Sequence, residues 1–177
     1  MSSVKKASIT AVCIALCYII PMIFHAVGLG MAFSPMHLPV LLCGIICGPL
    51  YGGFCGIAGP VLSSLATGMP PALHLIYMIP EMLVYGVAAG LLMKVLRFQN
   101  LFAKLYVSLI PAMIAGRIVG ILAKLLFFAF GLGSEAAEPL LVIANTYFVL
   151  TLPGAAVQLI LIPPLVFALK KARLIDV

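Results

Sequence analysis

The chain has 177 residues, of which 65% are hydrophobic and only 8% are charged, and its formal net charge is +6. Soluble domains carry roughly 25% charged residues, so this composition cannot cover a water-facing surface. It excludes a soluble enzyme, a disordered regulator and a disulfide-stapled secreted domain, and it indicates an integral membrane protein. The basic residues are too few and too scattered to follow a nucleic-acid backbone, so we expect no nucleic-acid partner.

Basic residues gather at three places along the chain, namely the N-terminus, residues 94–104 and the C-terminus. Because positive residues are retained on the cytoplasmic side of a membrane, all three places are predicted to lie inside the cell. Each apolar stretch between them must then cross the bilayer an even number of times. A spanning helix needs about 20 residues, so residues 7–93 have room for four helices and residues 105–169 for two. The sequence predicts an all-α integral membrane protein with six transmembrane helices, a single domain over residues 1–177 and both termini cytoplasmic.

Gly and Pro residues mark the ends of the apolar runs and so place each predicted helix to within a few residues. No small-x-small cleavage site follows the first run, which is therefore interpreted as a retained helix rather than a signal peptide. Outer connections are predicted at 25–39, 67–71 and 131–139, the last holding Glu135 and Glu138, and inner connections at 48–56 and 96–104. The helices are predicted near 5–24, 38–50, 53–67, 72–95, 104–130 and 143–170.

Small residues recur at every fourth position in the predicted helices. In lipid, helices associate through close backbone approach, so these glycines are predicted to pack helices within the chain. The five cysteines form no CxxC pair and are interpreted as small packing residues. The glycine pairs are Gly44/Gly48, Gly52/Gly56, Gly86/Gly90 and Gly116/Gly120.

The first helix carries a separate stripe of small residues, formed by Ala7, Ala11 and Ala15. The stripe lies next to the cytoplasmic end of the predicted bundle. Two interpretations stay open for it: packing inside the chain, or a docking surface for another membrane protein.

Three charged residues, Glu81, Arg117 and Lys124, fall within predicted helices. An ionised group at mid-bilayer costs at least ~2.5–3.5 kcal/mol, so each should face a partner or a water-filled cavity. Arg117 and Lys124 are seven residues apart, hence on one helix face, and Glu81 is within reach of either. One acid against two bases leaves an excess positive charge that a ligand carboxylate would neutralise. The alternative is an internal Glu81–Arg117 bridge, with Lys124 extending to the outer interface.

Further polar residues are predicted at the same outer level, with Tyr147 near the start of the sixth helix and Gln158 deeper in it. Their donors and acceptors suit a cavity for a small polar solute. No metal and no cofactor are expected, because the three histidines lie far apart without acidic companions at ligand spacing. The candidate binding residues are His37, His74, Tyr77, Glu81, Arg117, Lys124, Asn145 and Thr151.

The sequence holds no GxxxxGK[ST], GxSxG or HExxH motif, so we expect no catalytic residues and no enzymatic activity. Any energy source must then come from a partner. Two other classes stay open. One is a small membrane hydrolase using Ser63 or Ser64 with His74, although no acid is predicted to orient that histidine. The other is a membrane scaffold or assembly protein, which would not need a polar cavity.

The stretch HLPVLLCGIICGPLYGGFCGIAGPVLSSLATGMPP (37–71) resembles the second and third helices of the substrate-binding S components of energy-coupling factor (ECF) vitamin transporters. The six-helix layout and the Ala-rich first helix extend this resemblance over the whole chain. The resemblance implies capture of a small water-soluble vitamin or precursor at the outer face of a prokaryotic plasma membrane. It further implies docking on a membrane coupling subunit that carries two cytoplasmic ATPases, with Ala7, Ala11 and Ala15 as the docking stripe.

In that family the ligand lies between the outer halves of helices four to six, which is the zone of the candidate residues. The excess buried positive charge favours an anion such as pantothenate, nicotinate, biotin or a folate. The chain has no Trp and few aromatic residues, which argues against a large flat ring such as that of riboflavin. Pantothenate fits best, while thiamine is disfavoured by the two bases and kept open by Glu81.

Overall fold

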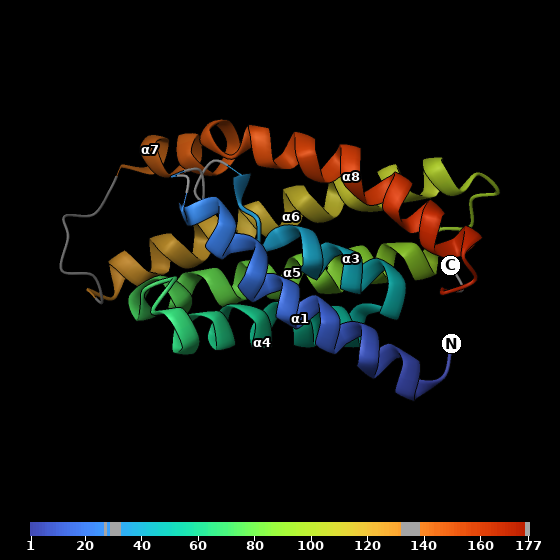
Figure 1. Ribbon diagram of the computed structural model, residues 1–177. Coiled ribbons are helices and arrows are strands. Elements are labelled where there is room, and N and C mark those ends of the chain that lie inside the picture. Colours follow the sequence, from blue (N-terminus) through green and yellow to red (C-terminus); the bar gives the residue numbers. More distant parts are fainter. Residues whose placement is uncertain (27, 29–32, 132–138, 176–177) are drawn as a thin grey trace.

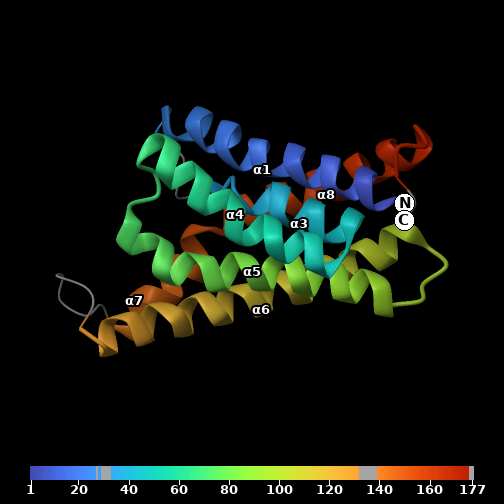
Figure 2. The same ribbon diagram turned by 90° about the horizontal axis from the view of Figure 1, so that it is seen from below.

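The computed structural model of the protein describes residues 1–26, 28, 33–131 and 139–175, and over these residues it contains helices and no strands. The long helices run roughly side by side, and the two termini and the α5–α6 connection lie at one end of the bundle (Figures 1 and 2). The elements are α1 (Ser3–Ala26), α3 (His37–Cys47), α4 (Pro49–Thr67), α5 (Ala72–Val95), α6 (Leu101–Ala129), α7 (Leu140–Asn145), the π-helix η1 (Thr146–Leu150) and α8 (Leu152–Lys171).

Five segments of the described chain are long and apolar enough to cross a membrane: α1, α4, α5, α6 and the run Leu140–Lys171. The predicted helix at 72–95 coincides with α5 at both ends. The predicted helix at 38–50 is α3, which has only 11 residues. At ~1.5 Å per residue α3 reaches about half of a ~30 Å hydrocarbon core. The all-helical architecture with apolar helices typical of a membrane protein is therefore confirmed, with five segments of the described chain long enough to span and one short helix.

The inner turn predicted over 48–56 is wrong in extent. Gly48 alone separates α3 from α4; it has a φ of 95°, a conformation that favours glycine, and Pro49 begins α4. The glycines that follow stay inside α4, because membrane helices use glycine for close packing rather than for breaking. Of the predicted outer connections, residues 27, 29–32 and 132–138, with Glu135 and Glu138, lie outside the described residues.

The short helix α3 forms the centre of the bundle. Nine of its 11 residues are buried, and it packs against α1, α4, α5 and α8. A helix that is apolar on every side is stable only when neighbours cover every side. Because α3 is held in this way, the residue at its start, His37, is placed rigidly against α5.

Glycines bring α3, α4 and α5 into backbone contact, which confirms the predicted packing role except at Gly48, where an added Cβ would meet no atom within 4 Å. A Cβ added at Gly52 would lie 2.5 Å from Gly44 Cα and 2.6 Å from the carbonyl oxygen of Gly86. The glycines of α6 serve differently, since a Cβ at Gly116 would meet the Tyr85 ring at 2.8 Å. The five cysteines are buried and free, as expected of packing residues.

The basic residues of the three predicted cytoplasmic places occupy the ends of elements that meet at one end of the bundle. This end holds the start of α1, the α5–α6 connection and the end of α8 (Figure 1). The grouping agrees with the charge pattern of the sequence. Which side of the membrane this end faces stays a prediction.

Candidate functional site

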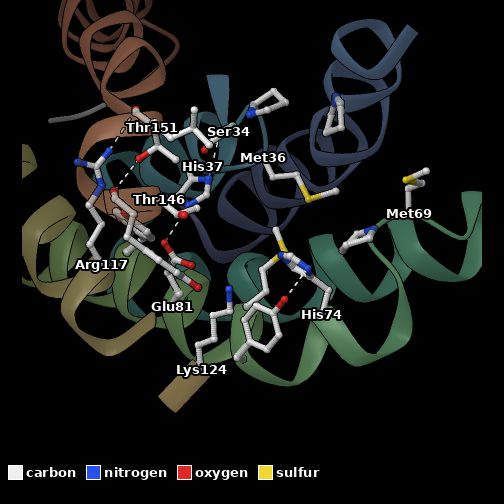
Figure 3. A pocket seen from close by; sticks show the side chains of 18 of the residues that line it. Ser34, Met36, His37, Met69, His74, Glu81, Arg117, Lys124, Thr146 and Thr151 are labelled. Carbon is white, nitrogen blue, oxygen red and sulfur yellow. Dashed lines mark hydrogen bonds and ion pairs between the residues drawn. The ribbon is translucent and has the colours of Figure 1, made fainter. Parts of the chain in front are cut away.

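A cavity of about 370 Å³ lies in the half of the bundle that is farther from the termini, beside the α4–α5 turn (Figure 1). It lies between α5, α6, η1 and the segment that leads into α3 (Figure 3). Seven of the eight predicted binding residues line it: His37, His74, Tyr77, Glu81, Arg117, Lys124 and Thr151. Tyr147 and Gln158, which were predicted at the same level, line it too. The sequence did not indicate four further lining residues, Ser34, Met36, Tyr85 and Thr146.

Asn145, the eighth predicted residue, is exposed and does not line the cavity. The sequence predicted an uninterrupted α-helix from residue 143. Instead α7 ends at Asn145 and the π-helix η1 follows, so that Thr146 and Tyr147 face the cavity. The wider turn of a π-helix changes the direction in which successive side chains project, and such turns are frequent at functional sites.

The buried carboxylate of Glu81 is paired with His37. Glu81 Oε1 lies 3.2 Å from His37 Nε2, and Glu81 is only 6% exposed. The His37 ring also packs edge-on against Tyr85, with ring centroids 4.7 Å apart. On the other side, Gly120 leaves room for the acid, since a Cβ there would lie 2.9 Å from Glu81 Oε2. Glu81 therefore joins α5 to α3 at the base of the cavity.

The carbonyl oxygen of Ser34 collects three hydrogen bonds. It accepts from the backbone N–H of His37 (3.1 Å), from His37 Nδ1 (3.0 Å) and from Gln158 Nε2 (3.4 Å). Ser34 has a φ of 44°, in the left-handed region that non-glycine residues rarely adopt. Strained backbone of this kind persists where surrounding contacts over-determine it, and it clusters at binding sites. These contacts attach the entry of α3 to α8.

Arg117 joins α6 to the junction of η1 and α8. Its Nη2 donates to the carbonyl oxygen of Thr151 at 3.4 Å (Figure 3). Its guanidinium also lies 5.8 Å from the centroid of the Phe148 ring. The internal Glu81–Arg117 bridge weighed above does not form between these two described residues, because Glu81 turns to His37. Among the described residues, the guanidinium thus contacts a backbone carbonyl and an aromatic ring at the cavity wall.

Lys124 is half-buried and its side chain points into the same hollow as Glu81 and His74 (Figure 3). Its Nζ lies 5.9 Å from the Tyr77 ring centroid and 5.8 Å from that of Phe128, within the range of cation–π attraction. The Tyr77 hydroxyl contacts His74 Nδ1 at 2.6 Å. Aromatic faces therefore hold this ammonium group at the mouth of the cavity.

The two serines considered for a hydrolase are engaged elsewhere. Ser63 Oγ donates to the carbonyl oxygen of Met69 at 2.9 Å, and Ser64 Oγ donates to that of Pro70 at 2.7 Å. Both hydroxyls hold the turn between α4 and α5, whose residues border the cavity. His74 contacts Tyr77 instead, so the serine–histidine arrangement is not assembled.

The predicted docking stripe occupies an open face of α1. Ala7, Ala11 and Ala15 are all exposed. The opposite side of the helix packs into the bundle through buried residues such as Thr10 and Cys17, which contact Cys43 and Met36 of the neighbouring chain segments.

Spanning helices around a charged cavity near one end define a multi-pass membrane protein with a site for a small solute. The model of the family described as the ECF transporter, substrate-specific component, matches residues 5–169. The chain therefore belongs to this family, whose members are substrate-binding transport subunits that dock with a coupling subunit and ATPases, and which are not enzymes. Searches of curated proteins and of solved structures found no match to the chain.

Proposed function

We propose that the cavity captures a small water-soluble vitamin or vitamin precursor that carries a carboxylate, with pantothenate as the first candidate. The observation that carries this proposal is the charge of the cavity wall. Arg117 and Lys124 of α6 both line it, while Glu81, the one acid among the described lining residues, is engaged with His37. A ligand carboxylate would gain charge-assisted hydrogen bonds from either base.

The size and polarity of the cavity support a small ligand. Its volume of about 370 Å³ is near the lower end of the ~300–1,000 Å³ typical of small-molecule sites, which disfavours a folate. Pantothenate offers two hydroxyls and an amide besides its carboxylate. The Thr146 and Thr151 hydroxyls donate to backbone carbonyl oxygens and can still accept from a ligand, and the Gln158 amide has both donor and acceptor capacity.

Nicotinate is the second candidate, and a specific observation favours it. Three tyrosines, Tyr77, Tyr85 and Tyr147, line the cavity, which makes it more aromatic than the composition of the chain suggests. A flat ring with one carboxylate would use both the tyrosine rings and the bases. Biotin, riboflavin and thiamine remain comparison ligands. A pure scaffold or assembly protein is disfavoured because it would have no use for such a cavity.

Delivery requires partners that supply energy. The exposed stripe Ala7, Ala11 and Ala15 supports docking of the coupling subunit on α1, since small residues permit close helix approach. In this proposal the termini are cytoplasmic, the cavity opens outward in a prokaryotic plasma membrane, and the coupling subunit carries two cytoplasmic ATPases.

The test is a binding titration of the purified protein in lipid nanodiscs with pantothenate, nicotinate, biotin, folate, riboflavin and thiamine. Two variants on α6 remove the same charge: Lys124→Gln within the cavity, and Lys104→Gln, which does not line it. Losing a charge-assisted hydrogen bond of about 1.5–3 kcal/mol predicts roughly tenfold to hundredfold weaker carboxylate binding for Lys124→Gln. Lys104→Gln should bind normally. Preferred binding of thiamine, or equal affinities of the two variants, would contradict the proposal.

A further inference from the structure

Both ring nitrogens of His37 face oxygen atoms that accept hydrogen bonds. Nδ1 lies 3.0 Å from the carbonyl oxygen of Ser34, and Nε2 lies 3.2 Å from Glu81 Oε1. A carbonyl oxygen only accepts, so Nδ1 must carry a proton. A neutral imidazole has a single N–H, so the lone pair of Nε2 would then face an ionised carboxylate, which also only accepts. Such a contact between two acceptors is repulsive.

Other arrangements of the ring do not remove this conflict. The tautomer with its proton on Nε2 satisfies Glu81 but turns the lone pair of Nδ1 toward the carbonyl oxygen of Ser34. A ring turned by 180° presents carbon atoms to both oxygens and loses both hydrogen bonds. Ser34 cannot move away easily, because its carbonyl oxygen also binds Gln158 and the backbone of His37. One additional proton satisfies every atom.

We propose that His37 and Glu81 form a proton-binding site. The pair holds one proton more than a neutral histidine and an ionised carboxylate would hold together. The proton sits either on Nε2, as an imidazolium that donates to the carboxylate, or on Glu81, as a carboxylic acid that donates to Nε2. In both forms Nδ1–H donates to Ser34 and the pair has no net charge.

Burial supports a neutral pair. The side chains of His37 and Glu81 are only 12% and 8% exposed. Burying a charged group is costly unless a partner compensates it, and the shared proton supplies that compensation within one hydrogen bond. The other titratable or charged groups that line the cavity around the pair are His74, Tyr77, Tyr85, Arg117, Lys124 and Tyr147.

The shared proton sets the charge of the cavity, a consequence that rests on the proposed function. With Glu81 neutralised by His37, nothing in the pair offsets the positive charges of Arg117 and Lys124. The formal charge summed over the described lining residues is then +2 rather than +1, which favours an anion.

The proton is visible by ¹⁵N nuclear magnetic resonance of protein labelled at histidine, because protonated and unprotonated ring nitrogens resonate far apart. A His25→Gln background leaves two histidines, His37 and His74. His74 is an internal control, since its partner is the Tyr77 hydroxyl, which can donate or accept, and one N–H suffices. Infrared spectroscopy of the same samples reports whether Glu81 is a carboxylic acid.

Near neutral pH we expect one of two results. Either both nitrogens of His37 are protonated, or Nε2 is unprotonated and a carboxylic-acid band is present. The Glu81→Gln variant should convert His37 to a neutral ring with its proton on Nδ1, because the introduced amide donates to Nε2, and should remove any such band. A wild-type His37 with a single N–H and no carboxylic-acid band would overturn the proposal. These spectra need no added substrate, so their outcome is separate from that of the vitamin titration.

Discussion

Replacing Gly52 with alanine should destabilise the bundle far more than the same change at the next residue, Gly53. Both glycines lie in α4 and are replaced by the same residue, so the two variants differ only in what the added methyl group contacts. A Cβ at Gly52 would lie 2.5 Å from Gly44 Cα and 2.6 Å from the Gly86 carbonyl oxygen, which are backbone atoms of α3 and α5. A Cβ at Gly53 would meet side-chain methyl groups instead, Val87 Cγ2 at 2.8 Å and Leu83 Cδ1 at 3.1 Å.

The size of the difference follows from these contacts. Ordinary van der Waals contact begins near 3.4 Å, so α4 must move away from α3 and α5 by about 1 Å to accept a methyl at Gly52. Overpacking of this kind costs typically 1–3 kcal/mol, and immobile backbone places Gly52 at the upper end. The methyl groups near Gly53 can rotate away. Alanine also favours both helices by up to ~1 kcal/mol, which cancels in the comparison. We expect Gly52→Ala to be about 2–3 kcal/mol less stable than Gly53→Ala.

The assay is reversible denaturant unfolding of both purified variants in the same detergent, followed by circular dichroism. Because α3 carries His37 and α5 carries Glu81, Gly52→Ala should also weaken substrate binding. Equal unfolding free energies for the two variants would show that the helices are not in backbone contact, and would refute the packing that positions the site.

Three further predictions concern the cavity and its surroundings. Gly120→Ala places a methyl 2.7 Å from Tyr147 Cε1 and 2.9 Å from Glu81 Oε2. A binding titration should therefore show at least roughly tenfold weaker substrate binding. Unchanged affinity would show that the ligand does not bind near Glu81. Ala11→Trp should abolish transport in cells that supply the coupling module while binding stays normal. Val12→Trp, a change at a neighbouring exposed position, should transport normally. Normal transport by both variants would show that the coupling subunit does not dock on the Ala7, Ala11 and Ala15 stripe of α1. Ser63→Ala removes the hydrogen bond to the Met69 carbonyl and should lower the unfolding free energy by about 1 kcal/mol, and no loss would show that the bond does not stabilise the turn.

The sequence predicted the depth of residues along helices well and their lateral partners poorly. The bounds of α5 and the placement of Glu81, Arg117 and Lys124 in one cavity followed from apolar runs and helical spacing. The pairing of Glu81 with His37 did not, because it depends on how far α3 enters the bundle. Counting apolar runs assigned one membrane crossing to each run, so α3, with 11 residues, was counted as a sixth transmembrane helix.

The irregular backbone of the site also could not be predicted from the sequence. The residues of η1 include no Gly or Pro, so nothing in the sequence distinguishes them from an α-helix, and this led to the wrong placement of Asn145. Ser34 gave no signal either, because its role is carried by a backbone carbonyl in a left-handed conformation. Both features arise from contacts between distant segments.

The central claim is that the cavity holds a small carboxylate of the vitamin class. Native mass spectrometry of the purified protein, followed by denaturation and identification of released small molecules, tests it most directly. A nanomolar ligand binds with about 12 kcal/mol and dissociates slowly, so it should survive purification. We expect a released carboxylate, absent from protein carrying Lys124→Gln and present with Lys104→Gln. An empty wild-type protein that also binds none of the vitamins tested would contradict the claim.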